Sequence, residues 1–283
     1  MTRVAVLQMT SGIDPAENAR TIVAAVERAA ADGARMLFTP EMCGLLDRDR
    51  QRAAAAIHHE GDDPVLAAVC DACARYGLWV ALGSLAVRQE GPRYANRAFV
   101  IDDHGVIRAR YDKLHMFDVD LATGESWRES NAYAPGEAVT VVDDTPVGRL
   151  GLAICYDIRF PALFEALGRR ACDVIAIPAA FTVPTGRDHW HVLQRARAIE
   201  ASAYVIAAAQ VGHHADGRDT FGHSLAIDPW GEILLDLGGE AAELGFAEID
   251  PARLVQVRQQ LPSLANRRSV PNWDPAMTPG WSR

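Results

Sequence analysis

The sequence lacks several features that would place it in common functional classes. No apolar run approaches the roughly 20 residues that span a bilayer, and the first nine residues form a strand pattern without a secretory leader. Positive charge is also scarce, because 28 Lys and Arg stand against 37 Asp and Glu, a net charge of −9. We therefore expect no membrane and no nucleic acid as a partner.

Motifs for cofactors and metals are missing as well. No Gly-x-Gly-x-x-Gly run or phosphate loop lies at an expected strand–helix junction. The pair Cys70 and Cys73 has the spacing of half a zinc or redox site but no second pair, so we expect it to pack in the core. Five histidines tempt a metal assignment, but their spacing matches no usual ligand set, and structural or substrate-contact roles are favoured for His189, His191, His213, His214 and His223. We expect no metal and no cofactor.

The cysteine content bears on the compartment. The chain has five cysteines, an odd number, at positions 43, 70, 73, 155 and 172. Reduced thiols are the simplest interpretation, and they predict a cytoplasmic protein.

The composition is that of a globular protein with one large core. Apolar residues make up 49% of the 283 positions, and we expect one α/β domain over residues 1–270 with a C-terminal tail at 271–283. Apolar periodicity, caps and turns predict helices at 15–32, 64–76, 161–168 and 189–201, and strands at 4–9, 35–39, 79–84, 94–102, 106–111, 139–142, 149–154, 173–178, 204–210, 224–228, 233–236 and 245–249. Weak similarity between 33–40 and 171–178 predicts two like halves that face each other.

One stretch, Gly-Leu-Ala-Ile-Cys-Tyr-Asp-Ile-Arg-Phe-Pro at 151–161, places Cys155 between a buried strand and a helix. Pro161 opens that helix, where its missing N–H costs nothing. Such a corner can expose a side chain and direct free backbone N–H groups at a ligand. The alternative is a buried cysteine that packs as a small hydrophobe.

Further charged residues lie where strands are expected to end. Glu41 directly follows one strand and Lys113 follows another, and sites gather at such ends in α/β sheets. Taken singly, each is equally typical of a solvated charge. The aperiodic segment 116–137 is long for a loop, which is typical of a functional segment, and it can supply a carboxylate from Glu125, Glu129 or Glu137.

Three blocks together resemble the nitrilase superfamily of carbon–nitrogen hydrolases. They are Phe38-Thr39-Pro40-Glu41-Met42, Tyr111-Asp112-Lys113-Leu114-His115 and the stretch 151–161, and the resemblance extends from residue 2 to about residue 268. It implies a four-layer αββα sandwich that forms a homodimer, or a higher homo-oligomer, through an outer helical layer.

The resemblance also implies a mechanism of amide hydrolysis. Cys155 would form a thioester, Glu41 would be the base, and Lys113 would stabilise the oxyanion with the Tyr156 backbone N–H. Glu129, in the context Glu-Ser-Asn, would be the second carboxylate. A carboxylate is a weak base for a thiol, so we expect burial and the second carboxylate to raise the pKa of Glu41. Substrate contacts are expected from Tyr156, Arg159, Phe181, Arg187, His189 and His214, and Arg195 and Arg218 are further cationic candidates for a substrate carboxylate.

Within the superfamily the chain resembles the Nit branch of amidases, which act on small amides. Deaminated glutathione and α-ketoglutaramate are substrates in that branch, and the runs 207–214 and 221–224 are more similar to enzymes that act on the first. The chain departs from that pattern at Val211 and Phe221. A nitrilase or a non-catalytic scaffold of the same fold are the alternatives.

Overall fold

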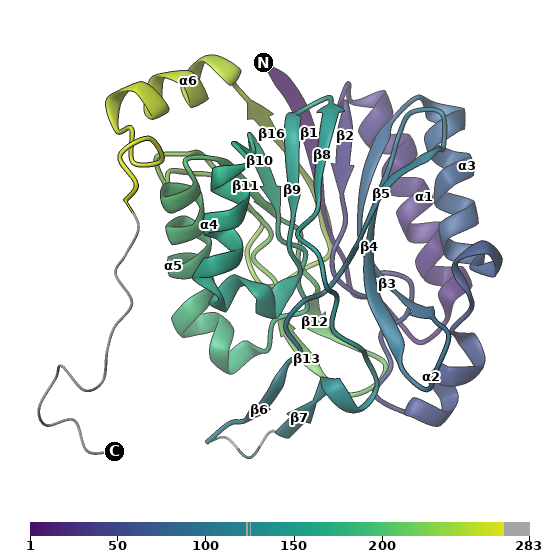
Figure 1. The fold of residues 1–283 in the computed structure, drawn as a ribbon. Coiled ribbons are helices and arrows are strands. Elements are labelled where there is room, and N and C mark those ends of the chain that lie inside the picture. The colour runs from purple at the N-terminus through teal and green to yellow at the C-terminus, as the bar shows by residue number, and fades with distance from the viewer. Residues whose placement is uncertain (123, 125, 269–283) are drawn as a thin grey trace, which may run out of the picture.

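The structure, a computed structural model, describes residues 1–122, 124 and 126–268. Two six-stranded sheets lie face to face at its centre (Figure 1). The first has the order β16-β1-β2-β3-β4-β5, with β1 Thr2–Gln8, β2 Met36–Phe38, β3 Trp79–Arg88, β4 Tyr94–Ile101, β5 Ile107–Asp112 and β16 Glu243–Ile249. The second has the order β15-β14-β11-β10-β9-β8, with β8 Val141–Thr145, β9 Gly148–Leu152, β10 Val174–Ala176, β11 Tyr204–Ala207, β14 Leu225–Ile227 and β15 Ile233–Asp236.

Helices cover the outer face of each sheet. In Figure 1, α1 (Pro15–Ala31) and α3 (Pro64–Tyr76) lie against the first sheet, and α4 (Pro161–Arg169) and α5 (Val183–Ala201) against the second. The arrangement confirms the αββα sandwich. Smaller elements complete the described chain: α2 Arg50–Ala56, α6 Pro251–Gln260, the 3₁₀ turns η1 Glu60–Asp62, η2 Glu129–Asn131 and η3 Cys155–Arg159, and the two-stranded pairs β6 Asp118–Asp120 with β7 Ser126–Arg128 and β12 Val211–His213 with β13 Asp219–Phe221.

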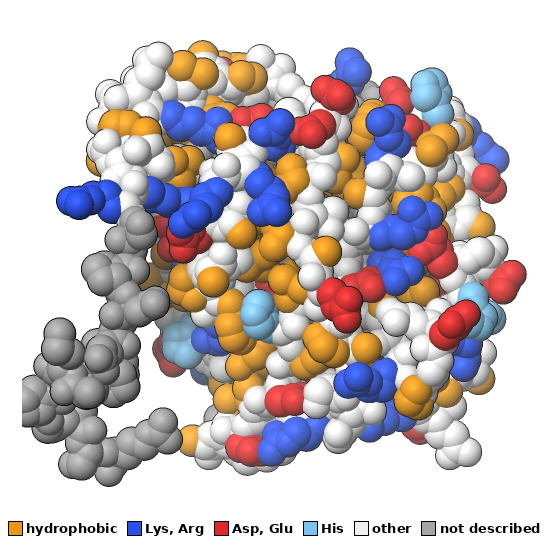
Figure 2. All heavy atoms as spheres, in the orientation of Figure 1, with side chains coloured by type: hydrophobic (Ala, Val, Ile, Leu, Met, Phe, Trp, Pro, Cys, Tyr) orange, Lys and Arg blue, Asp and Glu red, His pale blue; other side chains and the backbone are white. Residues whose placement is uncertain are grey.

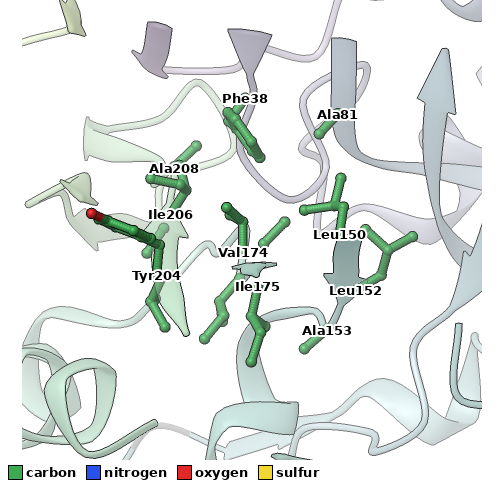
Figure 3. Close-up of a cluster of buried hydrophobic side chains, with 14 of the residues drawn as sticks. Phe38, Ala81, Leu150, Leu152, Ala153, Val174, Ile175, Tyr204, Ile206 and Ala208 are labelled. Atoms are coloured by element: carbon green, nitrogen blue, oxygen red, sulfur yellow. The ribbon is translucent and has the colours of Figure 1, made fainter. Parts of the chain in front are cut away.

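Alternation along the strands divides the core into layers. On β1, Val4 and Val6 belong to the cluster between the sheets, whereas Ala5 and Leu7 belong to the cluster under α1 and α3, because successive side chains point to opposite faces. Figure 3 shows the apolar layer between the sheets, to which these labelled residues belong: Phe38, Ala81, Leu150, Leu152, Val174 and Ile206.

The helix starts follow the cap signals of the sequence. Asp14 accepts a hydrogen bond from the Ala16 N–H, and Asp63 accepts from the N–H groups of Val65 and Leu66; a proline follows each aspartate at the first helical position. Gly77, at φ +63°, ends α3 in the left-handed conformation that glycine adopts freely.

Some boundaries differ from the expectation. The helix expected at 189–201 begins at Val183. Gly186 lies within it as a packing residue, because a Cβ there would collide with the Phe221 ring. The segment 116–137 contains β6, β7 and η2, and α2 and α6 were not predicted. The tail at 271–283 and Glu125 lie outside the described residues.

The outer surface carries charges of both signs. On the face drawn in Figure 2, acidic and basic side chains are intermingled with apolar ones. None of the helices in the described part of the chain is long and apolar enough to cross a membrane.

Candidate active site

Four predicted residues converge where the two sheets meet. Lys113 follows β5, and its Nζ lies 2.8 Å from Glu41 Oε1 and 2.9 Å from Glu129 Oε2. The Cys155 thiol is within hydrogen-bonding reach of the Glu41 carboxylate. A buried ammonium therefore bridges two carboxylates, one of which adjoins a thiol.

Glu41 is fixed by contacts from both halves of the sandwich. Its Oε2 accepts from the Ala180 N–H at 2.9 Å, in the loop after β10, and its Oε1 accepts from Asn96 Nδ2 at 2.9 Å. The Glu41 main-chain oxygen accepts from Gln210 Nε2 at 3.0 Å. These contacts explain how a carboxylate that is only 4% exposed remains in place.

Lys113 is the only lysine in the sequence; arginine supplies the other 27 of the 28 basic residues. The side chain is 2% exposed and donates to both glutamates. Lysine offers a compact charge with three donors, whereas the guanidinium is a planar fork. Arg97 also pairs with two carboxylates, those of Glu60 and Asp112, but it is 20% exposed. The single lysine thus lies between two carboxylates at a buried position.

Glu129 lies in η2, and two hydrogen-bond donors besides Lys113 fix the position of its carboxylate. Its Oε2 accepts from the Phe117 N–H at 2.7 Å, and its Oε1 accepts from Asn96 Nδ2 at 3.1 Å. Of its rivals from the same segment, Glu137 is exposed and Glu125 lies outside the described residues. The geometry therefore favours Glu129 as the second carboxylate.

Cys155 begins η3, three residues after β9 ends. Its φ of +47° is in the left-handed region, which is strained for a residue with a Cβ. The surroundings hold this conformation, since the Cys155 N–H donates to the Pro178 oxygen at 2.9 Å. The thiol is buried among apolar side chains, as the packing alternative requires, but it also adjoins the charged groups of Glu41 and Lys113.

Asp157 connects the cysteine turn to the lysine strand. This fully buried carboxylate accepts from the Ile154 N–H at 2.9 Å and the Tyr111 hydroxyl at 2.7 Å. It also accepts from the N–H and the Nδ1 of His115, at 3.0 and 2.7 Å. The residues that flank Lys113 and Cys155 therefore share one acceptor.

The charges shift the protonation equilibria in the site. Burial raises the pKa of Glu41, but the charge and hydrogen bond of Lys113 outweigh it and leave the pKa below its usual range. Burial and the Glu41 charge raise the pKa of the Cys155 thiol well above its usual range. Burial opposes the charge of Lys113, but Glu129 and Glu41 raise the pKa of Lys113.

This pattern corrects one expectation from the sequence. The pKa of Glu41 was expected to be raised, and it is lowered because the charge and hydrogen bond of Lys113, 2.8 Å away, outweigh burial. At neutral pH the resting site consequently holds an ionised Glu41, a charged Lys113 and a protonated Cys155.

Four of the expected substrate contacts lie together. The Arg159 guanidinium lies 5.9 Å from the Tyr156 ring centre and 5.4 Å from that of Phe181. Its Nη atoms donate to His189 Nδ1 at 3.3 Å. These residues form a cationic and aromatic group beside the cysteine turn.

The other expected contacts are placed differently. Arg187 is exposed on α5. His214 is 1% exposed, and its ring nitrogens contact the Ser11 oxygen at 2.9 Å and Thr220 Oγ1 at 2.7 Å. These contacts suit a structural role, so His214 is not among the substrate contacts that we propose below.

Two cationic candidates also have internal partners. Arg195 Nε donates to the Gly231 oxygen at 2.7 Å, and Arg218 Nε donates to Asp216 Oδ2 at 2.7 Å. Each of these Nε groups thus already donates to an acceptor within the protein, and neither is directed at a substrate carboxylate.

Sequence reasoning missed two groups that position the site. Asn96 bonds both glutamates, and the Ala180 N–H bonds Glu41. No pattern in the sequence marks either one. For Lys113 a signal was present, because the count of lysines alone singles it out.

Comparisons with known proteins agree with this geometry. The family described as carbon-nitrogen hydrolase matches residues 3–259. The chain is 40% identical to deaminated glutathione amidase of Yersinia enterocolitica over 284 residues, which is 97% of this chain and 96% of that protein.

Solved structures are similar too. The crystal structure of the C. elegans NitFhit protein has a TM-score of 0.87 and 35% identity, covering 94% of this chain and 65% of that one. A mutant amidase from Nesterenkonia sp. AN1, with acrylamide added at its active site cysteine, has a TM-score of 0.77 and 26% identity, covering 93% and 98%.

Proposed function

The chain belongs to the carbon–nitrogen hydrolase family, and from that premise we propose that it is an amidase that cleaves deaminated glutathione through a thioester on Cys155. The observation that carries the proposal is the Lys113 ammonium, which bridges Glu41 and Glu129 next to the cysteine. Nucleophile, base and oxyanion stabiliser are thereby within contact of one another, as covalent amide hydrolysis requires.

Acylation begins with the resting thiol. Glu41 takes the Cys155 proton while the sulfur attacks the amide carbon, and the carbonyl oxygen becomes an oxyanion that Lys113 and the Tyr156 backbone N–H stabilise. Glu41 then gives the proton to the amine nitrogen, the carbon–nitrogen bond breaks, and the amine leaves. The acyl group stays on the sulfur as a thioester.

Deacylation reverses these roles with water. Glu41, ionised again, takes a proton from a water molecule as the oxygen attacks the thioester carbon. The carbon–sulfur bond breaks, the proton returns from Glu41 to the sulfur, and the carboxylic acid is released. Atoms and protons balance over the cycle, because one water supplies the hydroxyl of the acid and the hydrogen of the amine.

The opposed pKa shifts of Glu41 and Cys155 determine the timing. A thiol whose pKa is raised is not ionised before substrate arrives, so proton transfer to Glu41 accompanies carbon–sulfur bond formation. Glu129 holds Lys113 against Glu41 and keeps the ammonium charged. Charge on the oxyanion therefore develops next to a cation that is already in place.

Substrate selection rests on the group around Arg159. Its guanidinium is the cation nearest the cysteine turn among those expected, and it suits the carboxylate of an α-keto acid. Phe181 and Tyr156 flank that cation and suit the carbon chain. Arg187, exposed on the same helix as His189, is available to a carboxylate at the far end of a longer substrate.

The test is a comparison of two substrates. Deaminated glutathione should give an α-keto acid and cysteinylglycine, and α-ketoglutaramate should give the acid and ammonia. We expect kcat/KM to be at least about tenfold higher for the first, which corresponds to about 1.4 kcal/mol, one good polar contact. Equal values, or a preference for α-ketoglutaramate, would reassign the enzyme as an omega-amidase.

The remaining alternatives have separate outcomes. Acid formed from a nitrile but from no amide would favour a nitrilase. No turnover of any amide or nitrile, with the fold intact, would favour a non-catalytic scaffold.

We also propose a homodimer formed through the outer face of α5. Val192 and Ile199 are 60% and 42% exposed there, and Trp230 is 50% exposed nearby; a patch of this kind is typical of an interface. Val192→Glu should shift sedimentation towards the monomer, and a wild-type monomer would exclude the dimer. Five free cysteines support a reducing compartment, and we propose the cytoplasm.

A further inference from the structure

Three side chains from separate elements meet at a second location, away from the Cys155 turn. His191 lies on α5, His223 follows β13, and Asp236 ends β15. The Asp236 carboxylate accepts from His191 Nε2 at 2.9 Å through Oδ2 and from His223 Nδ1 at 2.9 Å through Oδ1. One ring nitrogen of each histidine and one carboxylate oxygen of Asp236 could serve as metal ligands, and these three atoms lie within 4.8 Å of one another.

We propose that His191, His223 and Asp236 bind a divalent transition metal ion, with zinc as the ion that fits best. Two imidazole nitrogens and one carboxylate oxygen are ligands that zinc prefers, and water completes its coordination. The histidine spacing gave no hint of this, because the third ligand is an aspartate and the fold alone assembles the set.

The distances allow such an ion with little movement. Zinc lies about 2.0–2.2 Å from nitrogen and oxygen ligands, so tetrahedral ligand atoms are about 3.3 Å apart. Each imidazole–carboxylate pair, now at 2.9 Å, would open by about 0.4 Å. The two imidazole nitrogens, which lie within 4.8 Å of each other, would close by up to about 1.5 Å through side-chain rotation.

The ligands are held by their surroundings. His223 has φ +54°, and its N–H donates to the Gly238 oxygen at 2.7 Å while its oxygen accepts from Trp190 Nε1 at 2.7 Å. The Gly238 N–H in turn donates to Asp236 Oδ1 at 2.9 Å. Strained backbone of this kind persists only where neighbours determine it, and it is common at ligand sites.

The location is accessible and electrostatically suited. The side chains of His191, His223 and Asp236 are 33%, 26% and 31% exposed, so an ion and its water ligands can reach them. Two neutral imidazoles and one carboxylate leave one positive charge on a bound divalent ion, which a chain of net charge −9 tolerates.

A bound ion would fasten three elements of the second half. It would join α5, the end of β13 and the edge strand β15. Trp190, next to His191, packs on Phe181 at 4.9 Å, and Phe181 lies under Arg159. The ion therefore stabilises the wall that carries the proposed substrate contacts, and the chemistry at Cys155 does not pass through it.

The experiment uses the full chain without a histidine tag, in a Cys155→Ala background so that the catalytic thiol cannot compete for metal. After EDTA treatment and desalting, Zn²⁺ binding is measured by calorimetry and Co²⁺ binding by its visible absorption. We expect one ion per chain and a rise in Tm of roughly 5 °C or more at a hundredfold excess over Kd.

Matched variants locate the ion. His191→Ala and His223→Asn should each weaken binding at least tenfold; asparagine tolerates the left-handed backbone at position 223. His213→Ala is the control. His213 also pairs with an aspartate, Asp219, at 2.9 Å, but among the described residues this pair has no third metal-binding side chain beside it. Urea midpoints of the metal-free variants verify folding.

Three results would overturn the proposal: no saturable binding of either ion at micromolar concentration, equal binding by His191→Ala and the parent, or loss of binding in His213→Ala. Sedimentation with and without zinc is measured in parallel, because His191 neighbours Val192 of the proposed dimer face. None of these readouts depends on amidase activity.

Discussion

Replacing Lys113 by methionine tests the charge balance of the proposed active site. Methionine is of similar length but uncharged, so the variant leaves Glu41 and Glu129 without the cation that lies 2.8 and 2.9 Å from them. Removing one partner of a buried ion pair costs about 3–5 kcal/mol. We expect the free energy of unfolding at pH 7.5 to fall by that amount in urea denaturation, and turnover to be lost.

The loss should depend on pH in a direction set by Glu41. In the wild type the folded-state pKa of Glu41 is lowered, so its stabilisation is present above the unfolded pKa of about 4.3 and is lost as the pH falls towards and below it. Without Lys113, we expect burial to outweigh the remaining hydrogen bonds from Asn96 and Cys155 and to raise the folded-state pKa of Glu41 above the unfolded value. The variant then takes up a proton on folding and gains up to about 1.4 kcal/mol for each pH unit of acidification.

The difference in unfolding free energy between the two proteins should therefore shrink from pH 7.5 to pH 5.5. Adding Glu41→Gln to the Lys113→Met variant removes the buried negative charge that Lys113 no longer balances, and it should restore part of the stability. Arg169→Met is the surface control, because Arg169 and its partner Glu165 are 65% and 48% exposed, and it should barely move the urea midpoint. A difference that is constant with pH, or a double variant less stable than the single one, would refute the reasoning.

Three further substitutions test the roles of single residues. Cys155→Ser should abolish amide turnover while Cys172→Ser keeps it, and iodoacetamide should inactivate the wild type with substrate protecting, because Glu41 lies beside the Cys155 thiol and can take its proton as the sulfur is alkylated; inactivity of the Cys172 variant alone would move the nucleophile. Glu129→Gln should lower kcat by roughly 10²-fold or more because it frees Lys113, and the exposed Glu137→Gln should not; the reverse result would exchange their roles. Asp157→Asn should lower kcat, and the unfolding free energy by about 1–3 kcal/mol, because four donors lose a charged acceptor; unchanged kcat in a stably folded variant would limit Asp157 to structure.

The sequence pointed to the residues of the candidate site because three short blocks, which are weak singly, occur together in one chain. Lys113 directly follows β5, and Glu41 and Cys155 each lie three residues after a strand, β2 and β9, so strand patterns and short motifs suffice to find them. The αββα layers were likewise predictable from the resemblance, which follows from those same motifs.

The contacts that fix these residues were not predictable. Asn96 and Ala180, which hold Glu41, are 55 and 139 positions away from it in the sequence. Asn96 lies on β4, in the same sheet as β2, and Ala180 belongs to the other half. Such contacts depend on strand order and on the stacking of the sheets, which residue patterns do not encode. The His191, His223 and Asp236 cluster has the same origin, since each residue belongs to a different element.

Local signals also failed where packing overrode them. Gly186 lies within α5 because Phe221 occupies the space of a side chain, whereas isolated glycine in a sequence favours a helix end. In contrast, α6 carries the Asp250-Pro251 start signal that opens α1 and α3 as well. Its cap was present in the sequence, and only the weak apolar pattern behind it concealed the helix.

The solitary lysine makes the folded chain chemically selective towards amine reagents. Acylating reagents such as N-hydroxysuccinimide esters need an accessible, neutral amine, and Lys113 is 2% exposed, charged and held by two carboxylates. Labelling of the folded protein should thus stop at the terminal amine. A second label, visible as one added mass, would enter only when the sandwich opens. The single lysine therefore reports the exposure of the proposed active site.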